Sequence, residues 1–111
     1  MSKRGWFAAK TVYRWRPIEN SESLFEERVV LFEAGSFEEA VARAEMEAQE
    51  YCADSPDKVY LGYVNVFRLF DDAVGDRVEV YSLVRESDLS DQEYLDHFYD
   101  TCKERTETLE E

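Results

Sequence analysis

The segment VYLGYVNVFRLF, Val59 to Phe70, decides the fold, because it is the longest apolar run of the chain and contains no acidic residue. β-Branched and aromatic side chains are typical of a strand, and we predict that this segment forms a central strand. Successive side chains of a strand point to opposite faces of the sheet. We expect one face to pack under a helix and the other to stay open. The expected helix-facing side chains are Tyr60, Gly62, Val64 and Val66, and the expected open-face side chains are Leu61, Tyr63, Asn65, Phe67 and Leu69.

Two further segments before it are predicted as an antiparallel hairpin. Residues 5 to 16, GWFAAKTVYRWR, form the first strand, which Pro17 ends because proline lacks a backbone donor. The odd positions of this strand are mainly apolar and should meet the core. Residues 24 to 34, LFEERVVLFEA, form the second strand after a polar loop at 18 to 23. Its central acids are opposite in sign to the cations of the first strand, which favours this pairing.

Two helices have clear N-terminal signals. Ser36 followed by Glu39 is a capping-box pattern, and apolar residues recur after it at three- and four-residue spacing up to Cys52. Ser90 with Glu93 repeats the pattern and opens a C-terminal helix. The expected apolar stripe of that helix consists of Tyr94, Leu95, Phe98, Cys102 and Leu109.

A fourth strand, RVEVYSLVR at residues 77 to 85, is predicted after the turn-like segment DDAVGD at 71 to 76. The element order is then ββαββα. The simplest architecture for this order is a single α+β domain over residues 1–111, with a four-stranded antiparallel sheet, two helices on one face, and a frayed C-terminal end. The length of 111 residues is that of one domain.

The formal net charge is -13, and it divides as +5 over residues 1–18, -10 over 19–57 and -8 over 58–111. So negative a chain repels phosphate backbones, which disfavours generic nucleic-acid binding. No apolar run approaches the roughly 20 residues that cross a bilayer, and the first residues do not resemble a signal peptide, so we expect a cytoplasmic protein. Cys52 and Cys102 are expected to be reduced, buried thiols rather than a disulfide or metal ligands.

Several of these segments resemble the small bacterial family named domain of unknown function 4288. The resemblance rests on WFAAK from Trp6, SLFEERVVLFEA from Ser23, SFEEA from Ser36, GYVNVFRLF from Gly62 and EVYS from Glu79. It spans roughly the first 85 residues. It implies a single cytosolic domain and brings no catalytic or binding residues with it.

No segment has a pattern for a known reaction or cofactor. The chain lacks a dinucleotide-binding glycine motif, a phosphate-binding loop, a zinc-protease motif and a calcium loop. The single histidine, His97, falls on the polar side of its predicted helix, without the base and orienting group that catalysis requires. We therefore predict no catalytic residues, no metal site and no cofactor. This argues against an enzyme.

The open face is the best candidate site, because two helices on one side leave the other side of the sheet uncovered with aromatic side chains and both signs of charge. We expect it to bind a second copy of the chain or another protein. Two alternatives stay open. Acid-rich helices could neutralise a basic protein, or a pocket between Lys10, Arg14 and Asn65 could hold a small anion, as a binder or an enzyme. The predicted partner-binding residues are Trp6, Lys10, Arg14, Tyr63, Asn65, Phe67, Glu79 and Tyr81.

Overall fold

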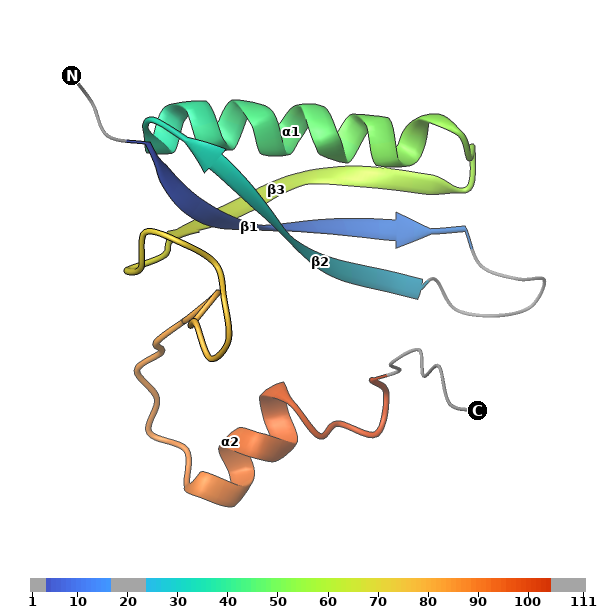
Figure 1. The fold of residues 1–111 in the computed structure, drawn as a ribbon. Coiled ribbons are helices and arrows are strands. Elements are labelled where there is room, and N and C mark those ends of the chain that lie inside the picture. Colours follow the sequence, from blue (N-terminus) through green and yellow to red (C-terminus); the bar gives the residue numbers. More distant parts are fainter. Residues whose placement is uncertain (1–3, 17–23, 105–111) are drawn as a thin grey trace.

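A computed structural model describes residues 4–16 and 24–104 of the chain. The predicted loop at 18 to 23 and the predicted frayed end lie outside the described residues. The element order is ββαβα (Figure 1). The elements are β1 (Gly5–Trp15), β2 (Leu24–Ala34), α1 (Phe37–Ala53), β3 (Lys58–Arg68) and α2 (Asp91–Phe98).

The sheet has three strands in the order β2-β1-β3, and β1 is antiparallel to both neighbours. β1 and β2 pair without a shift along all 11 residues. The pairing of β1 with β3 is irregular: between Thr11 and Tyr13, β1 advances two residues while β3 advances four, from Val64 to Tyr60. Gly62 sits in this bulge with φ +82°, a left-handed conformation that glycine adopts without steric cost. The bulge adds an even number of residues to β3. Even-numbered side chains of β3 therefore point to the same face of the sheet before and after the bulge.

α1 covers one face of the sheet and contacts all three strands (Figure 1). Its alanine stripe lets the helix approach closely, and the odd side chains of β1 lie under it, as predicted. Val64 and Val66 of β3 pack against the same core, which confirms the predicted helix-facing side of that strand. The buried residues of this layer are Phe7, Ala9, Thr11, Tyr13, Phe32, Ala34, Ala40, Ala44 and Ala48.

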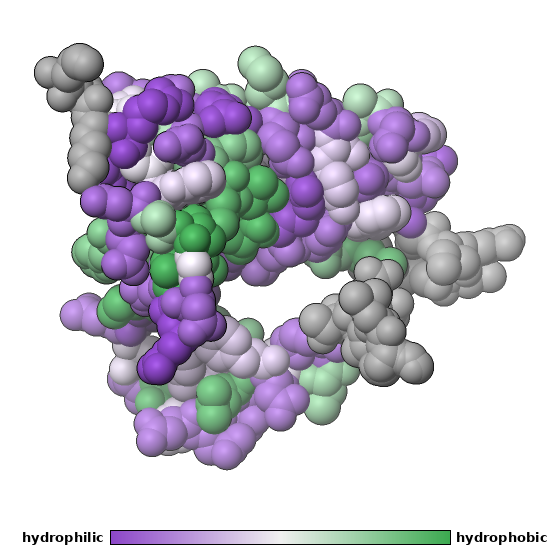
Figure 2. All heavy atoms as spheres, in the orientation of Figure 1, coloured by the Kyte–Doolittle hydropathy of each residue, from purple (hydrophilic) through white to green (hydrophobic). Residues whose placement is uncertain are grey.

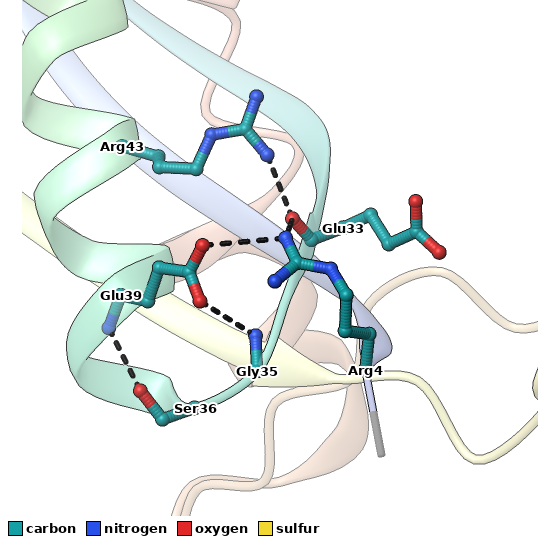
Figure 3. A network of polar contacts seen from close by, with 6 residues as sticks. All are labelled: Arg4, Glu33, Gly35, Ser36, Glu39 and Arg43. Atoms are coloured by element: carbon teal, nitrogen blue, oxygen red, sulfur yellow. Dashed lines mark hydrogen bonds and ion pairs between the residues drawn. The ribbon is translucent and has the colours of Figure 1, made fainter. Parts of the chain in front are cut away.

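The start of α1 is tied to the sheet by a small polar network (Figure 3). The Ser36 hydroxyl accepts a hydrogen bond from the Glu39 backbone N–H at 3.0 Å, so the predicted N-cap is confirmed. The Glu39 carboxylate accepts the Gly35 N–H at 2.8 Å and pairs with Arg4 at 3.2 Å. The hydrogen bond from Gly35, followed by the one from Arg4, lowers the pKa of Glu39. These contacts hold the end of β2 and the start of β1 against the helix.

The prediction of a fourth strand is wrong. Residues 77 to 85 have no regular secondary structure, and the sheet ends at three strands. The alternation of this segment is that of a strand, yet Tyr81 contacts the sheet face opposite α1 instead of extending an edge ladder. Arg77 has φ 67°, which breaks an extended path at the start of the segment.

The predicted placement of both helices on one face is also wrong. α2 lies on the opposite side of the sheet from α1 (Figure 1), and none of its residues is buried. Its start is as predicted, because Ser90 and Glu93 form a complete capping box. The helix ends at Phe98, so Cys102 lies beyond it, with φ 69°. The prediction that both cysteines are buried is wrong, because Cys102 is exposed and Cys52 is half-buried. Leu109 lies outside the described residues.

Candidate functional site

The candidate site is the open face, which we define as the sheet face opposite α1. The ladder of cross-strand neighbours decides which side chains meet there. On this face Ala8 lies between Leu31 of β2 and Phe67 of β3. Lys10 lies between Val29 and Asn65, and Arg14 lies between Phe25 and Val59.

Four of the predicted site residues form one cluster, in which three of them surround Tyr81. The Asn65 side-chain amide donates a hydrogen bond to the Tyr81 hydroxyl at 2.7 Å. The Lys10 ammonium lies 5.3 Å from the centre of the Tyr81 ring, and the Phe67 ring lies 6.1 Å from it. Lys10 also pairs with Glu27 at 3.1 Å, across the β1–β2 ladder. Tyr81 therefore joins the irregular C-terminal segment to the middle of the sheet.

The other four predicted site residues do not join this cluster. Trp6 is half-buried at the start of β1, whereas Arg14 is exposed near its end. Tyr63 is exposed in the bulge of β3. Glu79 is exposed in the irregular segment, two residues before Tyr81. The predicted set thus spans the length of the face instead of forming one compact site.

A groove of about 330 Å³ separates the sheet from the C-terminal segment. Figure 2 shows the corresponding gap between the sheet layer and the segment below it. Asn65 and two oppositely charged residues of the ladder, Lys10 and Glu27, line its sheet side. The full lining consists of Lys10, Val12, Glu27, Leu61, Tyr63, Asn65, Leu83 and Arg85.

The cations at this groove have partners within the chain. Lys10 pairs with Glu27, and Arg85 donates hydrogen bonds to the hydroxyls of Tyr94 at 3.1 Å and Tyr99 at 3.2 Å. The Arg85 guanidinium also lies 4.3 Å from the centre of the Phe98 ring. Arg14, which the anion-pocket hypothesis placed beside Lys10, does not line the groove.

A second polar cluster lies under the C-terminal half of α1, on the other side of the sheet. The Tyr51 hydroxyl donates hydrogen bonds to the two Glu26 carboxylate oxygens at 2.9 and 3.0 Å. The Arg28 guanidinium and the Lys58 ammonium each lie 3.7 Å from the centre of the Tyr51 ring. Arg28 also pairs with Glu47 at 3.0 Å. Burial, followed by the hydrogen bond to Glu26, raises the pKa of Tyr51 to about 12. A phenol held neutral in this way is no base at neutral pH.

Four exposed open-face residues are absent from the predicted partner-binding residues, namely Phe25, Val29, Val59 and Leu61. The alternation had already placed Leu61 on this face. Phe25 lies two residues before Glu27 on the same strand, and Val59 lies two residues before Leu61. Extending the alternation to the strand ends would have found Phe25 and Val59 as well. Their exposure is what makes the face unusual.

Metal chemistry has no candidate site among residues 4–16 and 24–104, where no three His, Cys, Asp or Glu side chains are arranged to hold an ion. His97 is exposed, as predicted, and contacts the Phe98 ring at 4.5 Å. In the same described ranges, no helix has the length and apolar character to cross a membrane.

Comparison with known proteins places the chain in a family. The model of a family described as a domain of unknown function (DUF4288) matches residues 6–82. The matched stretch contains all of the three strands except Gly5, together with α1 and Tyr81, whereas α2 lies outside it. No curated protein and no solved structure matches the chain.

Proposed function

We propose that this chain, which belongs to the DUF4288 family, is a protein-association module that binds a partner protein through its open face. The observation that carries the proposal is a set of apolar and aromatic side chains that the fold leaves in solvent on that face. Contiguous apolar surface on a soluble domain is typical of an interaction site. The set consists of Phe25 (66% exposed), Tyr63 (51%), Val29 (45%), Val59 (41%) and Leu61 (41%).

The charge of the open face supports a protein partner. The strand residues on this face include two cations, Lys10 and Arg14, and two acids, Glu27 and Glu33. They cancel, although the whole chain carries -13. The open face is therefore a neutral, apolar area on an acidic molecule, where a partner surface can dock without strong repulsion.

The C-terminal segment supports the same proposal, because it leaves much of the face uncovered. Tyr81 reaches the middle of the sheet, but the groove beside it stays open, and α2 buries none of its own residues. The end of the face around Arg14 keeps Phe25 and Val59 in solvent. A bound partner would remove this apolar surface from water, and each Å² buried contributes roughly 25 cal/mol of favourable free energy.

Site-specific photo-crosslinking in living cells tests the proposal. A benzophenone amino acid at Val59 reports contacts of the open face, and the same amino acid at Met46, which is 65% exposed on α1, is the matched control. We expect a discrete crosslinked protein from position 59 and none from position 46. Tyr63→Glu should abolish the crosslink, because a charge at this position would be desolvated by the partner, whereas Met46→Glu should not.

Equal crosslinking from both positions, or a crosslink that survives Tyr63→Glu, would contradict the proposal. Circular dichroism of each variant controls for folding. Salt dependence separates the acidic-surface alternative: binding through the acids of α1 weakens steeply as ionic strength rises, whereas binding through the neutral open face does not.

A further inference from the structure

The outer edge of β2 carries backbone groups that point away from the sheet. The Leu69 N–H donates to the Trp6 carbonyl at 2.9 Å, so even-numbered residues of β1 direct their backbone groups toward β3 and odd-numbered residues toward β2. Because β1 and β2 pair without a shift, the residues of β2 opposite odd positions bond to β1. The odd-numbered residues of β2 therefore point outward.

Hydrogen bonds from two arginine side chains also show that an odd-numbered residue of β2 points its carbonyl outward. Arg43 and Arg4 donate to the carbonyl oxygen of Glu33 at 2.7 and 3.0 Å (Figure 3). They occupy the outward carbonyl at one end of β2. The remaining outward residues are Phe25, Glu27, Val29 and Leu31, and within the described residues no strand pairs with this side of β2.

The two edges of the sheet differ in regularity. β3 is interrupted by the bulge at Gly62, and bulges are one of the devices that prevent edge pairing. β2 has 11 residues in unbroken register. It is also apolar in its middle, where Val29, Val30 and Leu31 follow one another. In Figure 2 hydrophobic side chains gather over this part of β2, below α1, with hydrophilic residues around them.

We propose that β2 pairs antiparallel with β2 of a second copy of this chain, about a two-fold axis at Val29. In this register Val29 lies opposite Val29 of the second copy, Glu27 opposite Leu31, and Arg28 opposite Val30. No two like charges meet. Moving the axis by one residue brings like charges together, because an axis at Arg28 places the two Arg28 side chains opposite each other and an axis at Val30 places Glu27 opposite Glu33. Directly opposed like charges destabilise a ladder, so the sequence of β2 selects the Val29 axis.

The pairing has a defined result. Outward residues Glu27, Val29 and Leu31 exchange backbone hydrogen bonds with the second copy, while Arg4 and Arg43 keep the Glu33 carbonyl out of the ladder. The two three-stranded sheets become one six-stranded sheet, with both copies of α1 on one side. The open faces become continuous and stay free, so this contact is separate from the one in the proposed function.

Proline substitution at the axis tests the edge. Val29→Pro removes an N–H that points away from β1, so the strand keeps all its bonds to β1, and edge strands accept proline at such positions. Val29→Ala is the matched control, since it shortens the side chain and keeps the N–H. Analytical ultracentrifugation should give twice the 13.1 kDa chain mass for the wild type and for Val29→Ala. Val29→Pro should dissociate at about thirtyfold higher concentration, as expected for two lost hydrogen bonds.

Amide hydrogen exchange of the wild type gives a second readout that needs no variant. The N–H groups of Arg28 and Val30, bonded to β1, should be protected at every concentration, whereas those of Glu27, Val29 and Leu31 should gain protection only as the dimer forms. A wild type that keeps the mass of one chain up to about 1 mM, or outward amides that exchange rapidly at all concentrations, would overturn the inference. Photo-crosslinking at Val59 on β3 still tests the open face in either case.

Discussion

Two buried hydroxyl groups under α1 form a hydrogen bond, and the contribution of this bond to stability can be measured. Thr11 and Tyr13 are neighbours on the same face of β1, only 2% and 0% exposed, and their hydroxyl oxygens are 2.6 Å apart. Arg28 also donates to the Tyr13 hydroxyl, at a longer 3.5 Å. Tyr13→Phe and Thr11→Val each remove one hydroxyl at almost constant shape, and the double variant removes both.

The expected free-energy changes follow from what each variant leaves behind. Tyr13→Phe leaves the Thr11 hydroxyl buried without this partner, which costs about 1–3 kcal/mol. Thr11→Val leaves the Tyr13 hydroxyl with Arg28 as its donor, so we expect the lower end of that range. The double variant leaves no unsatisfied hydroxyl. It should therefore cost less than Tyr13→Phe alone, with a coupling of about 1 kcal/mol or more between the two sites.

Urea unfolding followed by circular dichroism measures the cycle, and an unchanged m-value shows that the unfolded states remain comparable. Tyr60→Phe is the control, because its hydroxyl makes only a 3.5 Å contact with Glu45 at a half-buried position. We expect that control to change the unfolding free energy by no more than about 0.5 kcal/mol. A double variant whose cost equals the sum of the two single costs would refute the reasoning.

Three further predictions concern single positions. Tyr51, with its pKa raised to about 12 from the ordinary 10.0, is neutral in the folded state, so its contribution to stability is complete below pH 10 and is lost as pH rises toward 12; ultraviolet titration should show a late tyrosine transition, and Glu26→Gln should move it to lower pH. Ser36→Ala should cost about 1 kcal/mol of global stability in urea unfolding, whereas Ser90→Ala should leave the global transition unchanged, because α2 buries no residue. Gly62→Ala should cost about 1–2 kcal/mol from backbone strain alone, since no atom lies within 4 Å of the added methyl group; an unchanged urea midpoint would contradict this.

Part of the candidate site was predictable from alternation. The pattern placed Val64 and Val66 under α1 and put Asn65 on the opposite face beside Lys10, as the ladder has them. The same rule identifies Phe25 and Val59 once it is carried to the ends of the strands. The groove was not predictable, because its outer wall is formed by Leu83 and Arg85 from a segment whose strand-like pattern pointed to an edge. That the eight predicted site residues bind a partner stays a prediction.

Local interactions explain why the sequence by itself determined three strands, α1 and both helix starts. The capping serines, the alanine stripe and the alternating strands all act within a few residues, so their signals are readable from the chain. Only the tertiary structure decided where residues 77 to 85 and α2 lie. The hydrogen bond from Asn65 to Tyr81 and the contact of Lys10 with the Tyr81 ring join residues far apart in sequence. Such contacts override a strand propensity that spans only about 1 kcal/mol, and they place the C-terminal segment over the open face instead of along an edge.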